Sequence, residues 1–476
     1  MRPGDWSSDV CSSDLGNDIA QIGTLCEKYN LYFILDASQT AGAAGIDMEQ
    51  DHISAICFTG HKGLFGPQGT GGIALADGVC VKPLLSGGSG VHSFERKHPM
   101  ELPAALEAGT LNGHGIAGLH AALDWIKKTG IAAIHEKEMA LAEQFQRGIE
   151  TIPGIHLYGG EKRVAAIVSC NLADLDSAYV SDCLAEDYGI ATRAGVHCAP
   201  LMHTHFGTEK QGMVRFSFSC FNTTEEVEKA VRAMQDIAME NRGKVTAYVG
   251  AGGKTSSIRK RAETLRAEGK RVLILTTTKM MVPQEQEIFA AYEQTGQESV
   301  ILDTGAVSKE CRVAEKQLKE RVQSVLDTYG CCVAGSLIPG TEKFGMLPEK
   351  LMEDLLYLAD EILIEADGSA HMPVKAPAEH EPVLFPYMDE VVIVMGAHAI
   401  GKPLQEVCHR ADYAKKILKC DADKIVTATD IRVLAEQGYA IPIQKQFPWM
   451  KISKVTGKDI KLCLTAEKKD KERDKQ

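Results

Sequence analysis

Two spacings of hydrophobic residues follow one another along the chain. Compact apolar runs at residues 31–35 and 53–58 have the length and the aromatic and β-branched content of buried strands. Residues 19–28 and 131–149 instead place apolar side chains three and four positions apart, as on one face of a helix. Strands that alternate with helices indicate an α/β fold built around a sheet.

The same alternation continues through the rest of the chain. Further strands are expected at residues 73–76, 165–171, 245–249, 271–275, 331–337, 361–365 and 391–395, and further helices at residues 116–128 and 224–239. A glycine-rich stretch at residues 63–72 predicts a tight turn of the backbone. Residues 193–203 are polar, contain a glycine and are expected to form a loop.

The length of 476 residues exceeds what one hydrophobic core usually serves, so it predicts two or three domains. The composition changes at residues 241–244, just before a strand and a glycine-rich loop. We expect a non-native, adapter-like leader at 1–15, a large-domain remnant at 16–125, a small α/β domain at 126–243, a second α/β domain at 244–465 and a charged disordered tail at 466–476.

Composition narrows the classes of protein. Hydrophobic residues make up 44% of the chain and charged residues 24%, and no apolar run approaches the ~18 residues of a membrane span. A cytoplasmic protein without a membrane partner is therefore expected. The net charge of -12 argues against a nucleic-acid partner. The 14 cysteines are scattered and lack paired metal-binding spacings, which is typical of reduced intracellular thiols.

Side chains with cofactor chemistry follow the first two expected strands. Asp36 ends one strand, Gln39 lies one turn later, and Thr59, His61 and Lys62 follow the next strand. Pyridoxal 5'-phosphate (PLP) needs an amine for its aldehyde, an acid for its pyridine nitrogen and donors for its phosphate. The sequence therefore predicts a PLP site. Singly, these residues have simpler explanations, because an Asp at a strand end often caps a helix and a Lys among glycines often lies on the surface.

The motifs LDASQTAG at 35–42, FTGHKG at 58–63 and GPQGTGG at 66–72 resemble those of fold-type I, class V aminotransferases and, more narrowly, of cysteine desulfurases. The resemblance covers residues 19–239 and includes RAGVHCAP at 193–200. It implies a partial, N-terminally truncated fold-type I PLP-dependent transferase, in which a large-domain remnant is followed by a small α/β domain.

The resemblance implies a role for each residue at the strand ends. Asp36 would pair with the pyridinium of PLP, Gln39 would donate to its phenolate oxygen, and Thr59 and His61 would bind its phosphate. Lys62 would hold the cofactor and carry the proton removed from the substrate.

The resemblance also assigns residues farther along the chain. Thr110 would reach a phosphate across the interface of a homodimer. Arg215, or else Arg193, would bind the substrate carboxylate with its guanidinium fork. Cys198 would attack the substrate sulfur, and its neighbour His197 is expected to help keep that sulfur a thiolate. The simpler alternative for Cys198 is a buried structural cysteine.

The implied reaction converts L-cysteine to L-alanine and leaves a persulfide on Cys198, which passes sulfur to an acceptor protein. A selenocysteine lyase acting on L-selenocysteine would need the same residues, so it remains an alternative. A third possibility is that the truncated half is an inert scaffold for the second domain.

The second domain opens with a strand, the loop VGAGGKTS at 249–256 and a helix. This order aims backbone N–H groups and a helix N-terminus at a phosphate, although the loop is shorter than the usual GxxxxGK[ST] motif. The expected nucleotide-binding residues are Gly250, Gly252, Gly253, Lys254, Thr255 and Ser256. Glycines used only for packing are the alternative. The ligand would be ATP or GTP with Mg²⁺, held by Asp367 or alternatively by Glu365, unless Asp367 only caps a helix.

The loop at 249–256, together with TTTK at 276–279, EADGS at 365–369 and KAPAEHEP at 375–382, resembles the selenium-cofactor biosynthesis proteins of the YqeC type. The resemblance covers about residues 244–454 and implies a P-loop-like domain with a role in maturing selenium-dependent molybdenum hydroxylases. His371, Lys375 and His380 could line its site or lie on a solvated loop. The fusion suggests delivery of sulfur or selenium to a labile cofactor.

Overall fold

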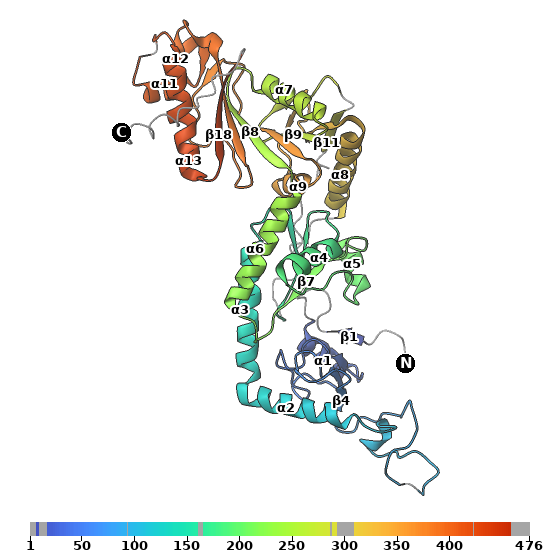
Figure 1. The fold of residues 1–476 in the computed structure, drawn as a ribbon. Helices are drawn as coiled ribbons and strands as arrows, with labels where there is room; N and C mark the ends of the chain where they lie inside the picture. The colour runs from blue at the N-terminus through green and yellow to red at the C-terminus, as the bar shows by residue number, and fades with distance from the viewer. Residues whose placement is uncertain are drawn as a thin grey trace. The chain divides into compact units, whose positions relative to one another are not determined.

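The computed structural model describes residues 6–8, 17–92, 94–159, 165–285, 288–292, 309–421 and 423–457. Figure 1 traces the chain from blue at the N-terminus to red at the C-terminus. The chain divides into two compact units, Met1–Ile237 and Ala238–Gln476. The expected tail at 466–476 and all of the expected leader except residues 6–8 lie outside the described residues.

The first unit begins with a four-stranded sheet in the order β1-β2-β3-β4. The elements of this part are β1 (Trp6–Ser8), α1 (Ile19–Lys28), β2 (Ile34–Asp36), β3 (Ala55–Thr59), β4 (Gly71–Leu75), the 3-10 turn Ala104–Leu106 and α2 (Gly113–Thr129). Strands β1, β2 and β3 are parallel, and β4 runs antiparallel to β3. Strand β1 lies within the expected adapter-like leader and pairs with β2. Its residues are mostly polar, so the hydrophobic pattern gave no sign of this strand.

The core of this sheet is small and local. Phe33, Leu35, Ala37 and Ile53 are buried together, and Ile22 of α1 packs against them. Helix α1 lies between β1 and β2 in the chain and packs its apolar side chains on the sheet. Because β2 and β3 pair in parallel, their carboxyl ends lie at the same edge of the sheet.

The remainder of the first unit is an antiparallel sheet, β5-β6-β7, with helices packed on it. Its elements are α3 (Ile131–Ile149), β5 (Ile155–Tyr158), β6 (Ile167–Leu172), α4 (Ser177–Tyr188), α5 (Pro200–Phe206), β7 (Val214–Ser217) and α6 (Thr224–Asn241). All of β6 is buried, and Phe145 of α3 packs against Phe216 of β7 with ring centroids 4.4 Å apart and the rings tilted by 40°. The loop expected at 193–203 is shorter, because Pro200 opens α5 at a position where its missing N–H is not needed.

The second unit is built on nine described strands in one mainly parallel sheet. Its elements are β8 (Lys244–Gly250), α7 (Lys254–Ala267), β9 (Val272–Thr276), β10 (Met280–Met281), β11 (Phe289–Tyr292), α8 (Lys309–Tyr329), β12 (Cys331–Leu337), β13 (Lys343–Gly345), α9 (Glu349–Leu355), β14 (Glu361–Glu365), β15 (Val374–Lys375), β16 (Glu390–Gly396), the 3-10 turn Ala397–Ala399, α10 (Leu404–Val407), β17 (Cys408–His409), α11 (Ala411–Leu418), α12 (Ala428–Val433), a π-helix (Leu434–Ala440), α13 (Ile441–Gln446) and β18 (Lys451–Gly457).

The strand order is β10-β13-β12-β9-β14-β8-β16-β18, with β11 beside β12. Strand β8 lies in the middle, between β14 and β16, and is parallel to both. The chain builds one side of the sheet from β9 to β13, returns to β14, and then builds the other side with β16 and β18. Ligands of such sheets usually bind at the carboxyl ends of the strands where the direction of building reverses.

Both faces of the central sheet are covered. Val245, Ala247 and Val249 of β8 point into one core, which contains side chains from α8, α9, α12 and α13. Tyr248 points into the other core, under α7. The alternation along β8 explains why its sequence is apolar almost throughout. Among the described residues, no helix is long and apolar enough to cross a membrane.

Candidate functional site

Asp36 ends β2 at the carboxyl edge of the first sheet. Its Oδ1 atom accepts hydrogen bonds from the backbone N–H of Ser38, at 3.0 Å, and from the Ser38 hydroxyl. The following turn is tied to the neighbouring strand, because the N–H of Ala37 donates to the carbonyl of Cys57 at 2.9 Å. The carboxylate is half-buried and is held at a fixed place on the edge.

Lys62 lies in a tight loop after β3. The N–H of Gly66 donates to the carbonyl of Gly60 at 2.7 Å, and the N–H of Phe65 donates to the carbonyl of Lys62 at 2.8 Å. Phe65 has a positive φ of 54°, which is rare for a large side chain. The loop therefore reverses direction within a few residues, as the glycine-rich sequence predicted.

The turn after Asp36 and the loop after Lys62 are in direct backbone contact. A Cβ atom on Gly63 would lie 2.6 Å from the carbonyl oxygen of Ala41, and one on Gly42 would lie 2.3 Å from the carbonyl oxygen of Gly63. Gly42 also has a φ of +84°. Only glycine allows this approach, so the two glycines bring the chain segments of Asp36 and Lys62 to the same part of the edge.

The other expected cofactor residues lie at the same edge or on the surface. The hydroxyl of Thr59 donates to the carbonyl of Ser38 at 3.5 Å, and Gln39 is half-buried in the turn after β2. His61 and Thr110 are exposed. A carboxylate, an amine, a hydroxyl and an imidazole at one sheet edge fit the donor and acceptor needs of PLP.

Cys198 is exposed at the end of the loop before α5. The guanidinium of Arg193 donates to its Sγ atom at 3.3 Å. Arg193 also forms an antiparallel bridge with Arg215 of β7, with N···O distances of 3.1 and 2.9 Å between their backbones. Both candidate arginines and the candidate nucleophile are thus brought together.

His197 was expected to help keep the Cys198 sulfur a thiolate, but its contacts differ from that expectation. It is buried, and its Nε2 atom faces the carbonyl of Arg193 at 2.9 Å. Burial lowers its pKa to about 4, and the charges of Arg215 and Arg193 add to the effect. A neutral imidazole that donates to a carbonyl holds the loop in place but contributes no charge to the sulfur. The cation that contacts Cys198 is Arg193. The sequence suggested Arg193 only as a ligand of the substrate carboxylate.

The glycine-rich loop of the second unit follows β8 and ends at the first residue of α7, Lys254. Gly250 has a φ of +93°, and a Cβ atom there would lie 2.2 Å from the carbonyl oxygen of Val394. Gly252 has a φ of +80° and would meet the carbonyl oxygen of Pro373 at 2.3 Å. These two positions need glycine both for conformation and for packing.

Asp367 occupies the centre of this loop. Its Oδ2 atom accepts a hydrogen bond from the N–H of Gly250 at 3.0 Å, and its Oδ1 atom pairs with the ammonium of Lys254 at 3.1 Å. The same Oδ2 atom lies 3.4 Å from the ammonium of Lys375 and accepts a hydrogen bond from the hydroxyl of Tyr439 at 3.0 Å. Asp367 and Lys375 are fully buried.

Glu365 faces the first turn of α7. The hydroxyl of Thr255 donates to its Oε2 atom at 2.9 Å. Burial raises the pKa of Glu365, although nearby Lys254 opposes that rise. Among the described residues no group of three or more His, Cys, Asp or Glu could hold a metal ion by itself. Mg²⁺ bound with a nucleotide needs only one or two protein oxygens besides phosphates and water, and the Thr255–Glu365 pair fits that need.

The three residues expected to line this site or lie on a solvated loop, His371, Lys375 and His380, differ in burial. Lys375 is buried and pairs with Glu381 at 2.6 Å, while His371 and His380 are exposed. Arg410 pairs with Glu381 from the other side. Burial would raise the pKa of Glu381, but hydrogen bonds from Lys375 and Arg410 lower it. The distant partners Arg410 and Tyr439 follow no local motif, so the sequence did not indicate them.

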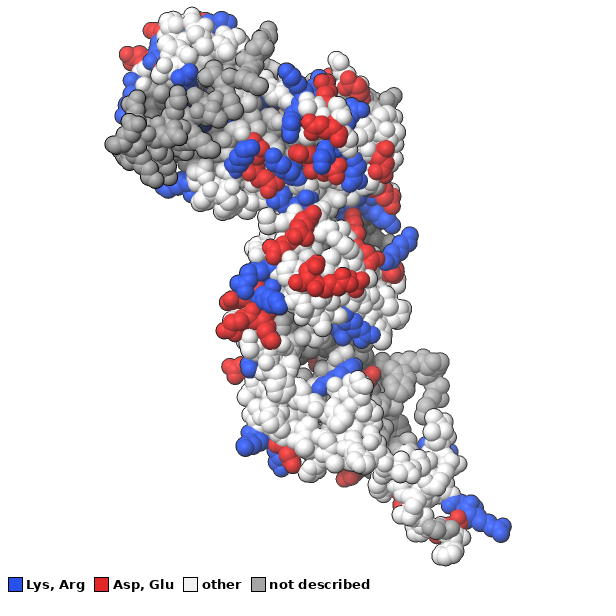
Figure 2. Space-filling model, in the orientation of Figure 1, with Lys and Arg blue, Asp and Glu red and all other residues white. Residues whose placement is uncertain are grey.

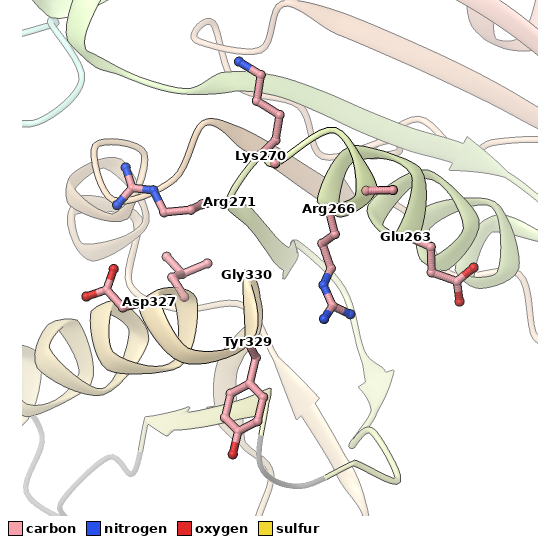
Figure 3. Close-up of a pocket in the computed structure, with 10 residues that line it drawn as sticks. Glu263, Arg266, Lys270, Arg271, Asp327, Tyr329 and Gly330 are labelled. Atoms are coloured by element: carbon pink, nitrogen blue, oxygen red, sulfur yellow. The ribbon is translucent and has the colours of Figure 1, made fainter.

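A hollow at the amino ends of the strands shares no lining residue with the site around the glycine-rich loop. It is lined by Glu263, Arg266, Ala267, Gly269, Lys270, Arg271, Leu326, Asp327, Tyr329 and Gly330, where α7 and α8 end (Figure 3). These residues precede β9 and β12, whereas the glycine loop follows the parallel strand β8, so the hollow lies at the amino edge of the sheet. Figure 2 shows acidic and basic side chains interspersed over this part of the displayed face.

The matches to known protein families divide the chain between the same two compact units. Residues 12–230 match the family described as Aminotransferase class-V, and residues 246–412 match the YqeC protein family. The match to the class-V family implies PLP as the cofactor of the first unit.

Individual relatives cover the first unit. A "Probable cysteine desulfurase" of Methanothermobacter thermautotrophicus is 33% identical over 226 residues, which are 46% of this chain and 56% of that protein. A cysteine desulfurase of Escherichia coli K12 is 30% identical over 46% of this chain and 54% of its own length. The apo structure of a cysteine desulfurase from Thermococcus onnurineus has 28% identity, a TM-score of 0.46, and coverage of 49% of this chain and 60% of that one.

The chain thus spans a little over half the length of the curated relatives that it matches. The resemblances stated from the sequence motifs are confirmed by both family matches. Residues 12–230 thus match the class-V aminotransferase family and are similar to cysteine desulfurases, and residues 246–412 match the YqeC family.

Proposed function

We propose that the first unit is a PLP-dependent cysteine desulfurase that forms L-alanine and a persulfide on Cys198. The observation that carries this proposal is the contact between Arg193, Cys198 and the backbone of Arg215. A nucleophile beside a guanidinium, next to a second arginine suited to a carboxylate, is the arrangement that sulfur abstraction from an amino acid requires.

When bound, PLP supplies an electron sink for the carbanion that forms at the substrate Cα. Lys62 takes up the Cα proton, and Asp36 provides the negative charge for the protonated pyridine nitrogen. Arg215 binds the substrate carboxylate. The Cys198 thiolate attacks the substrate sulfur, and an S–S bond forms as the Cβ–S bond breaks, which leaves a persulfide on Cys198. The carbon skeleton takes up a proton at Cβ and one from Lys62 at Cα and leaves as L-alanine.

The assembly is a homodimer in this proposal. Apolar side chains between β4 and α2 support it, since Leu84, Phe94 and Met100 are exposed by 95%, 103% and 66%. Apolar surface of this extent usually marks an interaction site. The exposed Thr110 lies in the same segment, as expected of a residue that reaches a phosphate in the partner's site.

The test is product analysis on the full chain with PLP and L-cysteine. Wild-type protein should release alanine and carry one sulfane sulfur, Cys198→Ala should retain the yellow band of bound PLP without the protein-bound sulfur, and Lys62→Ala should lack the band. Unchanged alanine formation by Cys198→Ala would refute the role of Cys198. Comparing turnover of L-cysteine and L-selenocysteine distinguishes a desulfurase from a selenocysteine lyase.

For the second unit we propose binding of ATP or GTP at the glycine loop. Positive φ angles at Gly250 and Gly252, the carboxyl end of the central strand and a lysine at the start of α7 support it. Of the two candidate magnesium acids we favour Glu365, because Thr255 contacts it whereas Asp367 is paired with lysines. The combined protein would deliver sulfur or selenium for the maturation of selenium-dependent molybdenum hydroxylases.

A further inference from the structure

The carboxylate of Asp367 lies where a bound anion is expected. It accepts the N–H of Gly250, the first glycine of the loop, and it pairs with Lys254, the lysine that opens α7. These are two of the donors that the proposed nucleotide site would turn towards a phosphate. In this structure they are taken by a side chain of the protein itself.

Burial makes this contact more than a surface ion pair. Lys254 is 4% exposed, and Asp367 and Lys375 are 0% exposed. A buried lysine that loses the anion paired with it is destabilised, and for Lys254 the partner is Asp367, with Glu365 as a further nearby carboxylate. The ammonium of Lys254 also donates to the carbonyl of Gly250 at 2.6 Å, which folds the side chain back over the loop. Asp367 therefore neutralises the loop and holds it closed.

Asp367 has a second set of partners that does not belong to the loop. Lys375 and the hydroxyl of Tyr439 contact its Oδ2 atom from β15 and the π-helix. The pKa of Tyr439 is raised well above its ordinary value by burial and by the Asp367 charge, so Tyr439 stays a hydrogen-bond donor. If the loop releases Asp367, these two groups can still satisfy the carboxylate.

We propose that Asp367 is an internal anion that closes the glycine loop, and that a polyphosphate ligand displaces it from Gly250 and Lys254 while Lys375 and Tyr439 retain it. The inference rests on the proposed nucleotide site and concerns its regulation. It gives Asp367 the opposite effect from that of a magnesium ligand: the carboxylate competes with the phosphate instead of helping to bind it.

The experiment measures binding of ATP, and separately of inorganic pyrophosphate, to the full chain by calorimetry in the presence of a magnesium chelator. Asp367→Asn keeps the size of the side chain and removes its charge. We expect its dissociation constant for ATP to fall about tenfold, the factor gained when a site closed roughly nine-tenths of the time becomes always open. Lys254→Ala should weaken binding in the same assay.

Two controls keep the outcome clear. Circular dichroism establishes that Asp367→Asn is folded; if it is not, the double variant Asp367→Asn with Lys375→Met removes one negative and one positive charge together and takes its place. Hydrogen exchange at the Gly250 amide should be faster in either variant, because the acceptor of that N–H is weakened.

The outcomes separate the two proposals. If wild-type protein binds ATP and the Asp367 variant binds it equally or more weakly, the internal-anion proposal is wrong and the nucleotide site stands. If neither protein binds ATP or pyrophosphate, both proposals are wrong. Binding that is unaffected by Lys254→Ala would place the ligand away from the glycine loop and would likewise overturn both.

Discussion

The buried imidazole of His197 makes the Cys198 loop sensitive to acid. The Nε2 atom faces the carbonyl of Arg193, so the neutral ring carries its proton there. Nδ1 is buried without a hydrogen-bond partner among the described residues, and a second proton on it would have no acceptor. The native state therefore disfavours the charged form, and burial, with the charges of Arg215, His203 and Arg193, lowers the pKa of His197 to about 4.

The sign and size of the effect follow from linkage. The unfolded chain takes up the proton near pH 6.5 and the folded chain only near pH 4, so stability is unaffected above about pH 7 and is lost as the pH falls from 6.5 to 4. The full difference is about 3 kcal/mol, at roughly 1.36 kcal/mol per pH unit. Between pH 7.5 and pH 5.0 the expected loss is about 2 kcal/mol.

The assay is urea-dependent hydrogen exchange of the peptide at 193–203 in the full chain, at pH 7.5 and 5.0, corrected for intrinsic exchange rates. His197→Asn keeps a donor for the Arg193 carbonyl but cannot take up a proton, so most of the pH-dependent loss should disappear. His203→Asn is the comparison variant. Burial also lowers the pKa of His203, so this substitution should remove only that residue's own contribution and leave the His197 contribution in place. An equal loss of stability in wild type and His197→Asn would refute the reasoning.

Two further predictions concern the two proposed binding sites. Gly63→Ala should weaken PLP binding by about 5- to 150-fold, since its methyl group would meet the Ala41 carbonyl and overpacking typically costs about 1–3 kcal/mol. Fluorescence titration with PLP measures the change, and Gly45→Ala, where nothing lies within 4 Å, should bind normally. Glu365→Gln should remove the magnesium-dependent part of ATP affinity while leaving magnesium-free binding intact; retained magnesium dependence in calorimetry would exclude Glu365 as the metal ligand.

The hydrophobic pattern predicted the helices and strands that carry a continuous apolar face or run within their own sequence. The helices Ile19–Lys28 and Ile131–Ile149 and the strands Cys331–Leu337 and Glu361–Glu365 have the expected bounds, because each has a continuous apolar face or run. The short helices α10 to α13 were not anticipated. Each is four to eight residues long, too short for a helical repeat to stand out, and its stability comes from packing on the sheet.

In the candidate sites too, residues within one sequence motif could be predicted, whereas contacts between residues far apart in the sequence could not. Motifs placed Asp36, Lys62 and Cys198 correctly relative to their strands and loops, because each motif is one continuous segment. The partners of Asp367 could not be predicted in this way. Tyr439 contacts Asp367 across 72 positions of sequence, and only the folded sheet brings them together.

Strand β18 and Tyr439 lie beyond residue 412, where the YqeC match ends. Strand β18 pairs with β16 along its whole length, from Lys451 to Gly457, and covers an edge of the central sheet. A fragment cut at 412 would leave that edge open to pairing between molecules and would deprive Asp367 of one of its donors. The smallest piece of the second unit suited to binding measurements therefore extends to residue 457, well past residue 412, where the family match ends.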